Sequence, residues 1–178
     1  MLVKEAQQEV RTVYVGGFFG QLVAATLWLI SAALATWASP RAAIVELVLG
    51  GFFIFPITQL SLRLSGRPAS LRKENPLGHL AMQLAFTLPL SMLLLFPVTA
   101  FHVQWFYPGL MILLGAHYLP FTFLYGMPMF FVLGSILVGS GVGIAELLPT
   151  QFSPGGWFAG FTLLIFAFIG RAIAARSK

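Results

Sequence analysis

The chain has 178 residues, of which 58% are hydrophobic and 8% are charged, and its formal net charge is +5. About a quarter of the residues in a soluble domain are charged, so this composition excludes a water-soluble globule and predicts an integral membrane protein. The sequence contains no cysteine and no aspartate, which excludes disulfides, thiolate metal sites and aspartate-based catalysis.

Apolar runs long enough to cross a bilayer follow one another along the chain. Residues 3–13 come first and predict a short surface helix of mixed charge. A crossing needs about 20 apolar residues, and proline, glycine and polar turns divide the remainder into six such runs. The predicted spans are about 14–38, 42–62, 80–101, 104–125, 128–148 and 157–175. The sequence therefore predicts an all-α integral membrane bundle of six transmembrane helices, one transmembrane domain over residues 1–178.

A polar loop, residues 63–79, separates the second and third predicted spans. Its basic residues are Arg63, Arg67, Arg72 and Lys73. Six crossings put both ends of the chain on the side of this loop, and of the ten Lys and Arg residues only Arg41 falls on the other side. Short basic loops stay in the cytoplasm, so we expect cytoplasmic N- and C-termini in a cell membrane, the inner membrane of a bacterium. The loop is a candidate contact for anionic lipid, and no nucleic-acid partner is expected.

Aromatic residues support the same orientation. They fall at the outer ends of the predicted spans, as one side of an interfacial aromatic belt does. These residues are Trp37, Trp105, Tyr107 and Trp157.

Polar side chains form a candidate inner layer near the cytoplasmic ends of four spans. At 1.5 Å rise per residue, the residues that reach a similar depth are Gln21, Gln59, Gln83, His117 and Thr122. One interpretation is a cavity open to the cytoplasm that recognises a polar solute or passes protons through His117. The other is that these groups only form hydrogen bonds between helices.

A second candidate group lies at the opposite boundary. Glu46 and Glu146 fall at the outer ends of spans two and five, and His102 lies in an outer loop. This outer rim would attract cations, and Arg41 is placed to pair with Glu46. The three residues lack the local spacing of a metal site, so no metal site is predicted.

Glycines four residues apart place small surfaces on single helix faces and allow a partner backbone to approach closely. Three such pairs occur: Gly16 with Gly20, Gly139 with Gly143, and Gly156 with Gly160. We interpret these pairs as helix-packing faces, either within the bundle or toward another subunit.

Three segments carry a likeness to known proteins: Gly115 to Phe121, Trp105 to Pro108, and Gly66 to Ser70. On these residues the chain resembles a family of small bacterial multi-span membrane proteins known only as a domain of unknown function. The likeness extends over nearly the whole chain. It implies no activity and assigns no functional residue.

Three functions remain open from the sequence. The inner polar layer favours a small permease or channel-like protein for a solute, an ion or protons. The glycine faces favour a non-catalytic scaffold or partner subunit, as a homo-oligomer or with another membrane protein. An intramembrane enzyme is disfavoured because Gly-x-Ser-x-Gly, His-Glu-x-x-His and phosphate-binding loops are absent, and no cofactor is expected. In all three cases the lipid bilayer is the first partner.

Overall fold

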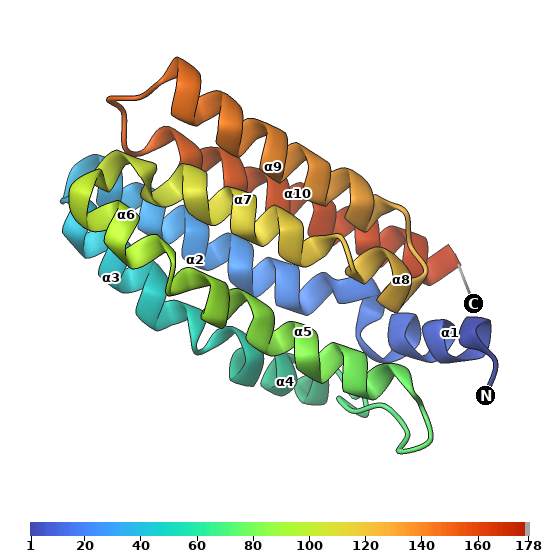
Figure 1. Cartoon of the computed structure of the whole chain (residues 1–178). Helices are drawn as coiled ribbons and strands as arrows, with labels where there is room; N and C mark the ends of the chain where they lie inside the picture. The colour runs from blue at the N-terminus through green and yellow to red at the C-terminus, as the bar shows by residue number, and fades with distance from the viewer. Residues whose placement is uncertain (177–178) are drawn as a thin grey trace.

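Prolines, glycines and polar turns divide the chain into the helices of Figure 1, a computed structural model that describes residues 1–176. The first half contains α1 (Val3–Val13), the 3-10 turn η1 (Val15–Gly17), α2 (Phe18–Trp37), α3 (Pro40–Gly51), α4 (Ile54–Leu64), α5 (Leu77–Met92) and α6 (Leu95–Phe101). The second half contains the 3-10 turn η2 (Val103–Trp105), α7 (Phe106–Tyr118), α8 (Phe121–Tyr125), α9 (Met129–Leu147) and α10 (Pro154–Arg176).

The predicted all-α membrane bundle is confirmed. Five stretches among the described residues are long and apolar enough to cross a bilayer: Val15–Trp37, Leu77–Phe101, Val103–Tyr125, Met129–Leu147 and Pro154–Arg176. The pair α3 and α4, bent by 54°, makes a sixth if it is one span. The short helix expected at residues 3–13 is α1.

Two of the spans predicted as single helices are broken near the middle, and the fourth is interrupted closer to its end, at Leu119 and Pro120. The second divides at Phe52 and Phe53, and the third at Leu93 and Leu94. A proline ring clashes with the carbonyl of the residue four positions earlier, which is Phe52 for Pro56 and Leu93 for Pro97. The helix therefore ends near that carbonyl and starts again before the proline.

Four helices form the densely packed part of the bundle. α2 packs along α10, and α7 packs along α9. Glycines bring these helices together: a Cβ at Gly115 would lie 2.6 Å from the carbonyl oxygen of Gly134, and one at Gly160 would lie 2.7 Å from a methyl group of Leu29. We call α2, α7, α9 and α10 the central four helices.

The two broken spans lie against different members of the central four helices. α3 and α4 pack on α2, whereas α5 and α6 pack on α7. Together α3, α4, α5 and α6 are called the outer pair of spans; in Figure 1, α3, α4 and α5 lie along the lower edge of the bundle and α6 continues α5 toward its left end. Large apolar side chains of the outer pair are turned away from the protein, for example Phe55 and Leu94.

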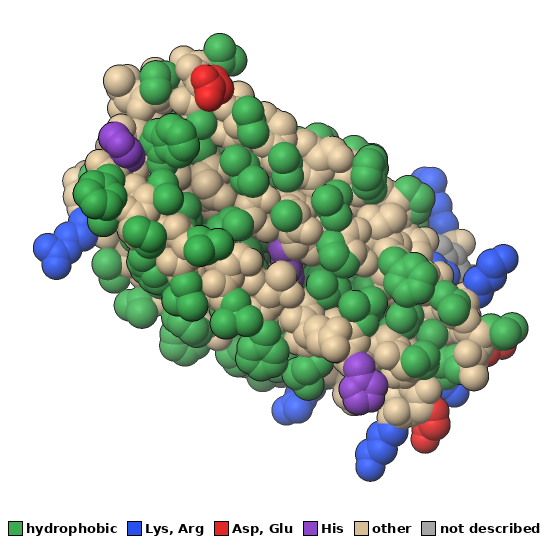
Figure 2. All heavy atoms as spheres, viewed as in Figure 1, with side chains coloured by type: hydrophobic (Ala, Val, Ile, Leu, Met, Phe, Trp, Pro, Cys, Tyr) green, Lys and Arg blue, Asp and Glu red, His purple; other side chains and the backbone are tan. Residues whose placement is uncertain are grey.

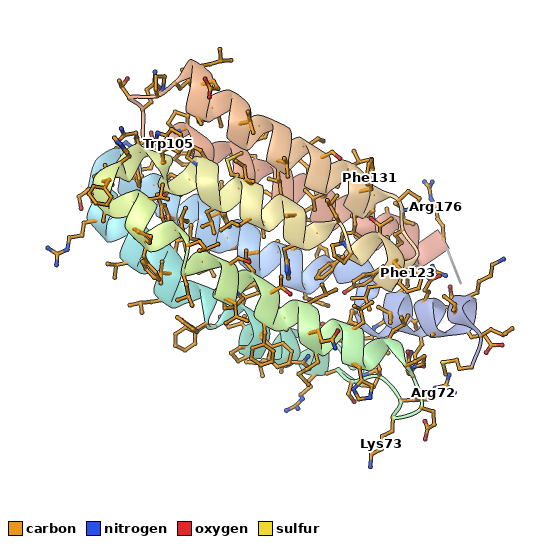
Figure 3. The ribbon with its side chains drawn as sticks, in the orientation of Figure 1. Arg72, Lys73, Trp105, Phe123, Phe131 and Arg176 are labelled. Carbon is orange, nitrogen blue, oxygen red and sulfur yellow. The ribbon has the colours of Figure 1, made fainter. Side chains whose placement is uncertain are left out.

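Charges lie toward the two ends of the bundle, and hydrophobic side chains cover much of the flank between them (Figure 2). Arg72, Lys73 and Arg176 lie at the end that holds both ends of the described chain, and Trp105 lies at the other (Figure 3). We call these the terminal end and the Trp105 end. Lys178, which the sequence analysis counted with the basic residues, lies outside the described residues.

Candidate functional site

The five residues of the inner polar layer lie in different environments. Gln21 in α2 is 2% exposed, and neither its amide nitrogen nor its amide oxygen has a hydrogen-bond partner among the described residues. His117 in α7 and Thr122 in α8 are half-buried, and the Nδ1 and Oγ1 atoms of these side chains are buried without a partner in the same range. Gln59 in α4 is half-buried, whereas Gln83 in α5 is exposed. Gln83 therefore faces away from the buried polar groups.

Several hydroxyl groups in the spans donate a hydrogen bond to the carbonyl oxygen four residues earlier in the same helix. Five that do so at 2.8–3.1 Å are Thr26, Thr36, Ser61, Thr87 and Ser91. Three threonine hydroxyls do not, although their oxygen atoms are buried: Thr58 in α4, Thr99 in α6 and Thr122 in α8. The Thr58 oxygen lies 3.8 Å from the Cβ position of Gly20 in α2, one residue before Gln21. The sequence analysis missed Thr58 and Thr99, and their spacing carries no signal that separates them from the self-satisfied hydroxyls.

The three residues of the outer rim do not form a site together. Glu46 in α3 is half-buried and its Oε2 atom is unpaired, while His102 and Glu146 are exposed. Within residues 1–176, no three His, Asp or Glu side chains are close enough to hold a metal ion. Arg41 and Glu46 form no ion pair in the same range, so the pairing suggested by the sequence does not occur here.

A buried hydrogen-bond network joins three helices near the Trp105 end. The Ser31 hydroxyl in α2 donates to the carbonyl oxygen of Ala43 in α3 at 2.8 Å, and its oxygen lies 2.6 Å from the Tyr107 hydroxyl of α7. Ser31 has one proton, so Tyr107 donates to Ser31. Both side chains are 0% exposed. Tyr107 is thus a core residue and no member of the aromatic belt, unlike Trp37, which is 75% exposed.

The glycine pairs differ in what they contact. A Cβ at Gly156 would lie 2.9 Å from the ring of Tyr107 and 3.0 Å from Ala32, and Gly160 meets Leu29 as described above. Gly16 lies against the backbone of Gly170 in α10 and has a positive φ of 63°. A Cβ at Gly20 would lie at ordinary van der Waals distance, 3.8 Å, from the Thr58 hydroxyl oxygen. Gly139 and Gly143 in α9 have no atom within 4 Å of their Cβ positions in the part of the chain that is described. Their shared face is free of other helices.

At the terminal end, α1 is tied to the basic loop by one carboxylate. Glu9 accepts from the Arg72 backbone N–H at 2.7 Å, from the Arg72 guanidinium at 3.1 Å and from the Asn75 amide at 3.1 Å. Burial raises the pKa of Glu9, but the three hydrogen bonds and the Arg72 charge together lower it by more than burial raises it. The pKa of Glu9 therefore lies below its ordinary value. Arg67 also donates to the Thr12 carbonyl oxygen at 3.2 Å. Of the four basic residues proposed to contact lipid, Arg63 and Lys73 are exposed, and their side chains form no hydrogen bond or ion pair with any other described residue.

The other side of α1 is tied to the end of α8, just before the turn to α9. The Gln7 amide donates to the Phe123 carbonyl oxygen at 2.6 Å, and Arg11 donates to the Tyr125 carbonyl oxygen at 2.8 Å. Ala6 and Val10 are 0% exposed beneath these bonds. We call α1, the loop it holds and the end of α8 the α1 clamp. The sequence predicted the helix, but its alternation of charges gave no indication of which loops it would bind.

Comparison with known proteins places the chain in a protein family but assigns it no activity. The model of one protein family, described as a family of unknown function (DUF7010), matches residues 3–172. No curated protein and no solved structure matches the chain. The match covers most of the chain, in agreement with the resemblance to a family without an assigned function.

Proposed function

Since the chain belongs to the DUF7010 family of unknown function, we propose its function from its own polar groups: it is a small permease or channel-like protein for a small polar solute, an ion or protons. The observation that carries this proposal is a set of buried polar atoms without partners. They belong to Gln21, Glu46, Thr58, Thr99, His117 and Thr122. These residues come from six helices and lie in segments that are candidates for membrane spans.

The energetic argument is that such atoms are costly in a membrane unless something binds them. Burying a polar group without a hydrogen bond costs about 1–3 kcal/mol in proteins, and hydrocarbon offers no water to replace the bond. Polar side chains inside a membrane commonly mark the path of a solute, an ion or a proton. Water or a transported solute would satisfy these groups, whereas helix-to-helix hydrogen bonds, the structural alternative, are not formed by them here.

The outer pair of spans is the part that we expect to move during transport. Thr58 and Thr99 lie on it, while Gln21 and His117 lie on the central helices. Each outer span is broken near its middle, at Phe52 to Phe53 and at Leu93 to Leu94. Broken helices next to polar groups are the elements from which many transporter sites are built. The proposed path therefore runs where the outer pair meets the central four helices.

The orientation is part of the same proposal. Arg41 lines a groove together with Val103 at the Trp105 end, whereas Arg72, Lys73 and Arg176 lie at the terminal end (Figure 3), and positive residues favour the cytoplasmic side. We therefore assign the terminal end to the cytoplasm, in a cell membrane and specifically a bacterial inner membrane. The exposed Arg63 and Lys73 would face anionic lipid there.

Flux measurements on purified protein in vesicles test the proposal. The probes are protons, followed with an internal pH dye, and small uncharged solutes, followed by vesicle swelling. We expect Gln21→Leu and His117→Ala to change the flux of the transported probe several-fold. Gln83→Ala is the matched control, because Gln83 is exposed and should leave the flux unchanged.

Two results would contradict the permease. One is the absence of flux above empty vesicles for every probe. The other is a flux that all three substitutions alter equally, since an effect of Gln83 would reflect general damage and no defined path.

A second candidate function rests on a separate observation. Gly139 and Gly143 have open space around them, and small residues on one face allow close helix association in membranes. The chain would then be a non-catalytic scaffold or partner subunit. Because the sequence has no cysteine, Gly139→Cys gives a single thiol that should form a disulfide-linked dimer in membranes if this face pairs with itself. Ile165→Cys, on an exposed position of α10, is the control and should not cross-link.

A further inference from the structure

A groove lies between the start of α3 and the end of α6, near the Trp105 end. Its volume is about 550 Å³, and Ile44, Phe96 and Thr99 are among the residues that line it. A smaller pocket shares these three residues and reaches the buried side chains of Leu95 and Phe106. The groove therefore begins at the surface of the bundle and leads inward between the two outer spans.

The mouth of the groove carries one positive charge. Arg41, the second residue of α3, lines the groove, and its side chain is exposed. It forms no hydrogen bond or ion pair with any other described residue. None of the described residues that line the groove is acidic. The N-terminus of α3, capped by Ser39, adds its partial positive charge at the same place.

We propose that this groove binds one anionic phospholipid, with the phosphate at Arg41 and an acyl chain between α3 and α6. The volume lies within the range of about 300–1,000 Å³ that ligand sites occupy. The guanidinium group matches the geometry of phosphate oxygens, and the apolar walls match a hydrocarbon chain. The charge lies at the end of the bundle and the apolar part lies deeper, which is the order of the phosphate and the acyl chain in a membrane lipid.

This inference is independent of the permease. A bound lipid at the Trp105 end would fill the space between the two outer spans whether or not the protein transports anything. The unpaired Thr99 hydroxyl lies in this groove, but the proposal assigns no hydrogen bond to it.

Native mass spectrometry of the purified protein tests the site. The protein is released from detergent in the presence of palmitoyl-oleoyl-phosphatidylglycerol or of the corresponding phosphatidylcholine at equal concentration. We expect one phosphatidylglycerol to be retained in preference to phosphatidylcholine. Arg41→Gln should weaken the phosphatidylglycerol adduct by about fivefold, the effect of one basic residue near an anionic lipid surface. Arg176→Gln removes an exposed charge at the other end and should have no effect.

A second pair of variants tests the acyl-chain part of the site. Ala100→Trp and Val45→Trp place a large ring in the groove at exposed positions, so folding should be preserved, and both should reduce retention of the lipid. Equal retention of the two lipids by the wild type, or an unchanged adduct in Arg41→Gln, would overturn the proposal. A dimer that Ala100→Trp dissociates would assign the groove to a second copy of the chain and would overturn it as well. Displacement of the lipid by millimolar inorganic phosphate would show a simple anion site, with the same consequence.

Discussion

The central four helices and the outer pair of spans differ in how they are packed. In the stretch that contains α7, 44% of the most apolar window is buried inside the protein, whereas only 11% is buried in the stretch formed by α5 and α6. Glycine contacts hold the central helices together, as at Gly115 and Gly134. Prolines divide the outer spans, as at Pro56 and Pro97. One half of the bundle is thus fixed by close backbone contact, and the other is exposed and segmented.

The pairing of buried polar groups differs in part between the central four helices and the outer pair of spans. The network of Ser31 and Tyr107 links the central helices to α3 with its hydroxyl groups paired. Among the described residues, buried polar atoms without a hydrogen-bond partner occur on three of the four outer helices, at Glu46, Thr58 and Thr99, and on two of the central four, at Gln21 and His117. A close contact such as that of Ser31 with Tyr107 holds its hydroxyl groups paired, whereas a loosely held span leaves room for water, lipid or solute. This difference makes the outer pair the better place to look for function, and two substitution experiments test it directly.

The largest expected effect comes from adding one methyl group inside the central helices. In Gly115→Ala the new Cβ would lie 2.6 Å from the Gly134 carbonyl oxygen and 2.7 Å from a Val138 methyl group, and the backbone of α9 has to move. Overpacking of this kind costs about 1–3 kcal/mol. We expect a clear loss of thermal stability in detergent, measured by tryptophan fluorescence during heating.

Gly51→Ala is the matched control in the outer pair. No atom lies within 4 Å of its Cβ position in the described chain, so the substitution should be neutral or stabilise the helix by at most about 1 kcal/mol. If both variants lost the same stability, the division between a close-packed and a loosely packed half would be wrong.

An effect of at most similar size is expected at the buried hydroxyl network. Ser31→Ala leaves the Tyr107 hydroxyl buried with no acceptor, a change that costs about 1–3 kcal/mol. Tyr107→Phe removes the hydroxyl itself and leaves Ser31 bonded to Ala43, so it should cost about 0.6 kcal/mol, the mean for hydrogen bonds between membrane helices. The measurement is again thermal unfolding of each variant. An equal loss in the two variants would indicate that packing around the rings, and not the hydrogen bonds, stabilises this contact.

The sequence was sufficient to predict the apolar runs, five of which are long enough to cross a bilayer with α3 and α4 a sixth if they form one span, because bilayer thickness fixes the length of such a run. It was not sufficient for their continuity. Pro56 and Pro97 lie within the predicted spans, but each exerts its effect at the carbonyl four residues earlier, so the breaks fall at Phe52 and Leu93. Reading each proline from that carbonyl would have placed both breaks, but it would also have placed one at Ala85, before Pro89, where α5 continues.

The candidate site was less predictable, because pairing depends on which helix faces meet. Gln21 and Gln83 are the same residue type at similar predicted depth, yet one is buried and the other exposed. Tyr107 was placed in the aromatic belt by its position at the end of a span, although its side chain points into the core. Nothing in the local sequence of α1 indicated that Glu9 would hold a loop more than 60 residues further along the chain.

The smallest effect is expected at the α1 clamp, where Glu9 of α1 holds the loop between α4 and α5. The Arg72 side chain is 66% exposed, and exposed ion pairs contribute about 1 kcal/mol or less. The expected change is therefore local. A spin label on Ser70→Cys, the only thiol in the chain, reports the mobility of the loop, and Glu9→Gln should make that label more mobile at neutral pH.

The pH dependence sharpens this last test. The pKa of Glu9 is lowered in the folded protein, so the ionised carboxylate favours the docked loop. Docking is fully present above the ordinary pKa of 4.5 and is lost as the pH falls below that value through the lowered pKa. The label should become mobile over that acidic range in the wild type and in the control Glu5→Gln, since Glu5 bonds only to the Leu2 backbone. In Glu9→Gln the same transition should be absent, and its persistence there would assign the loop's attachment to a group other than Glu9.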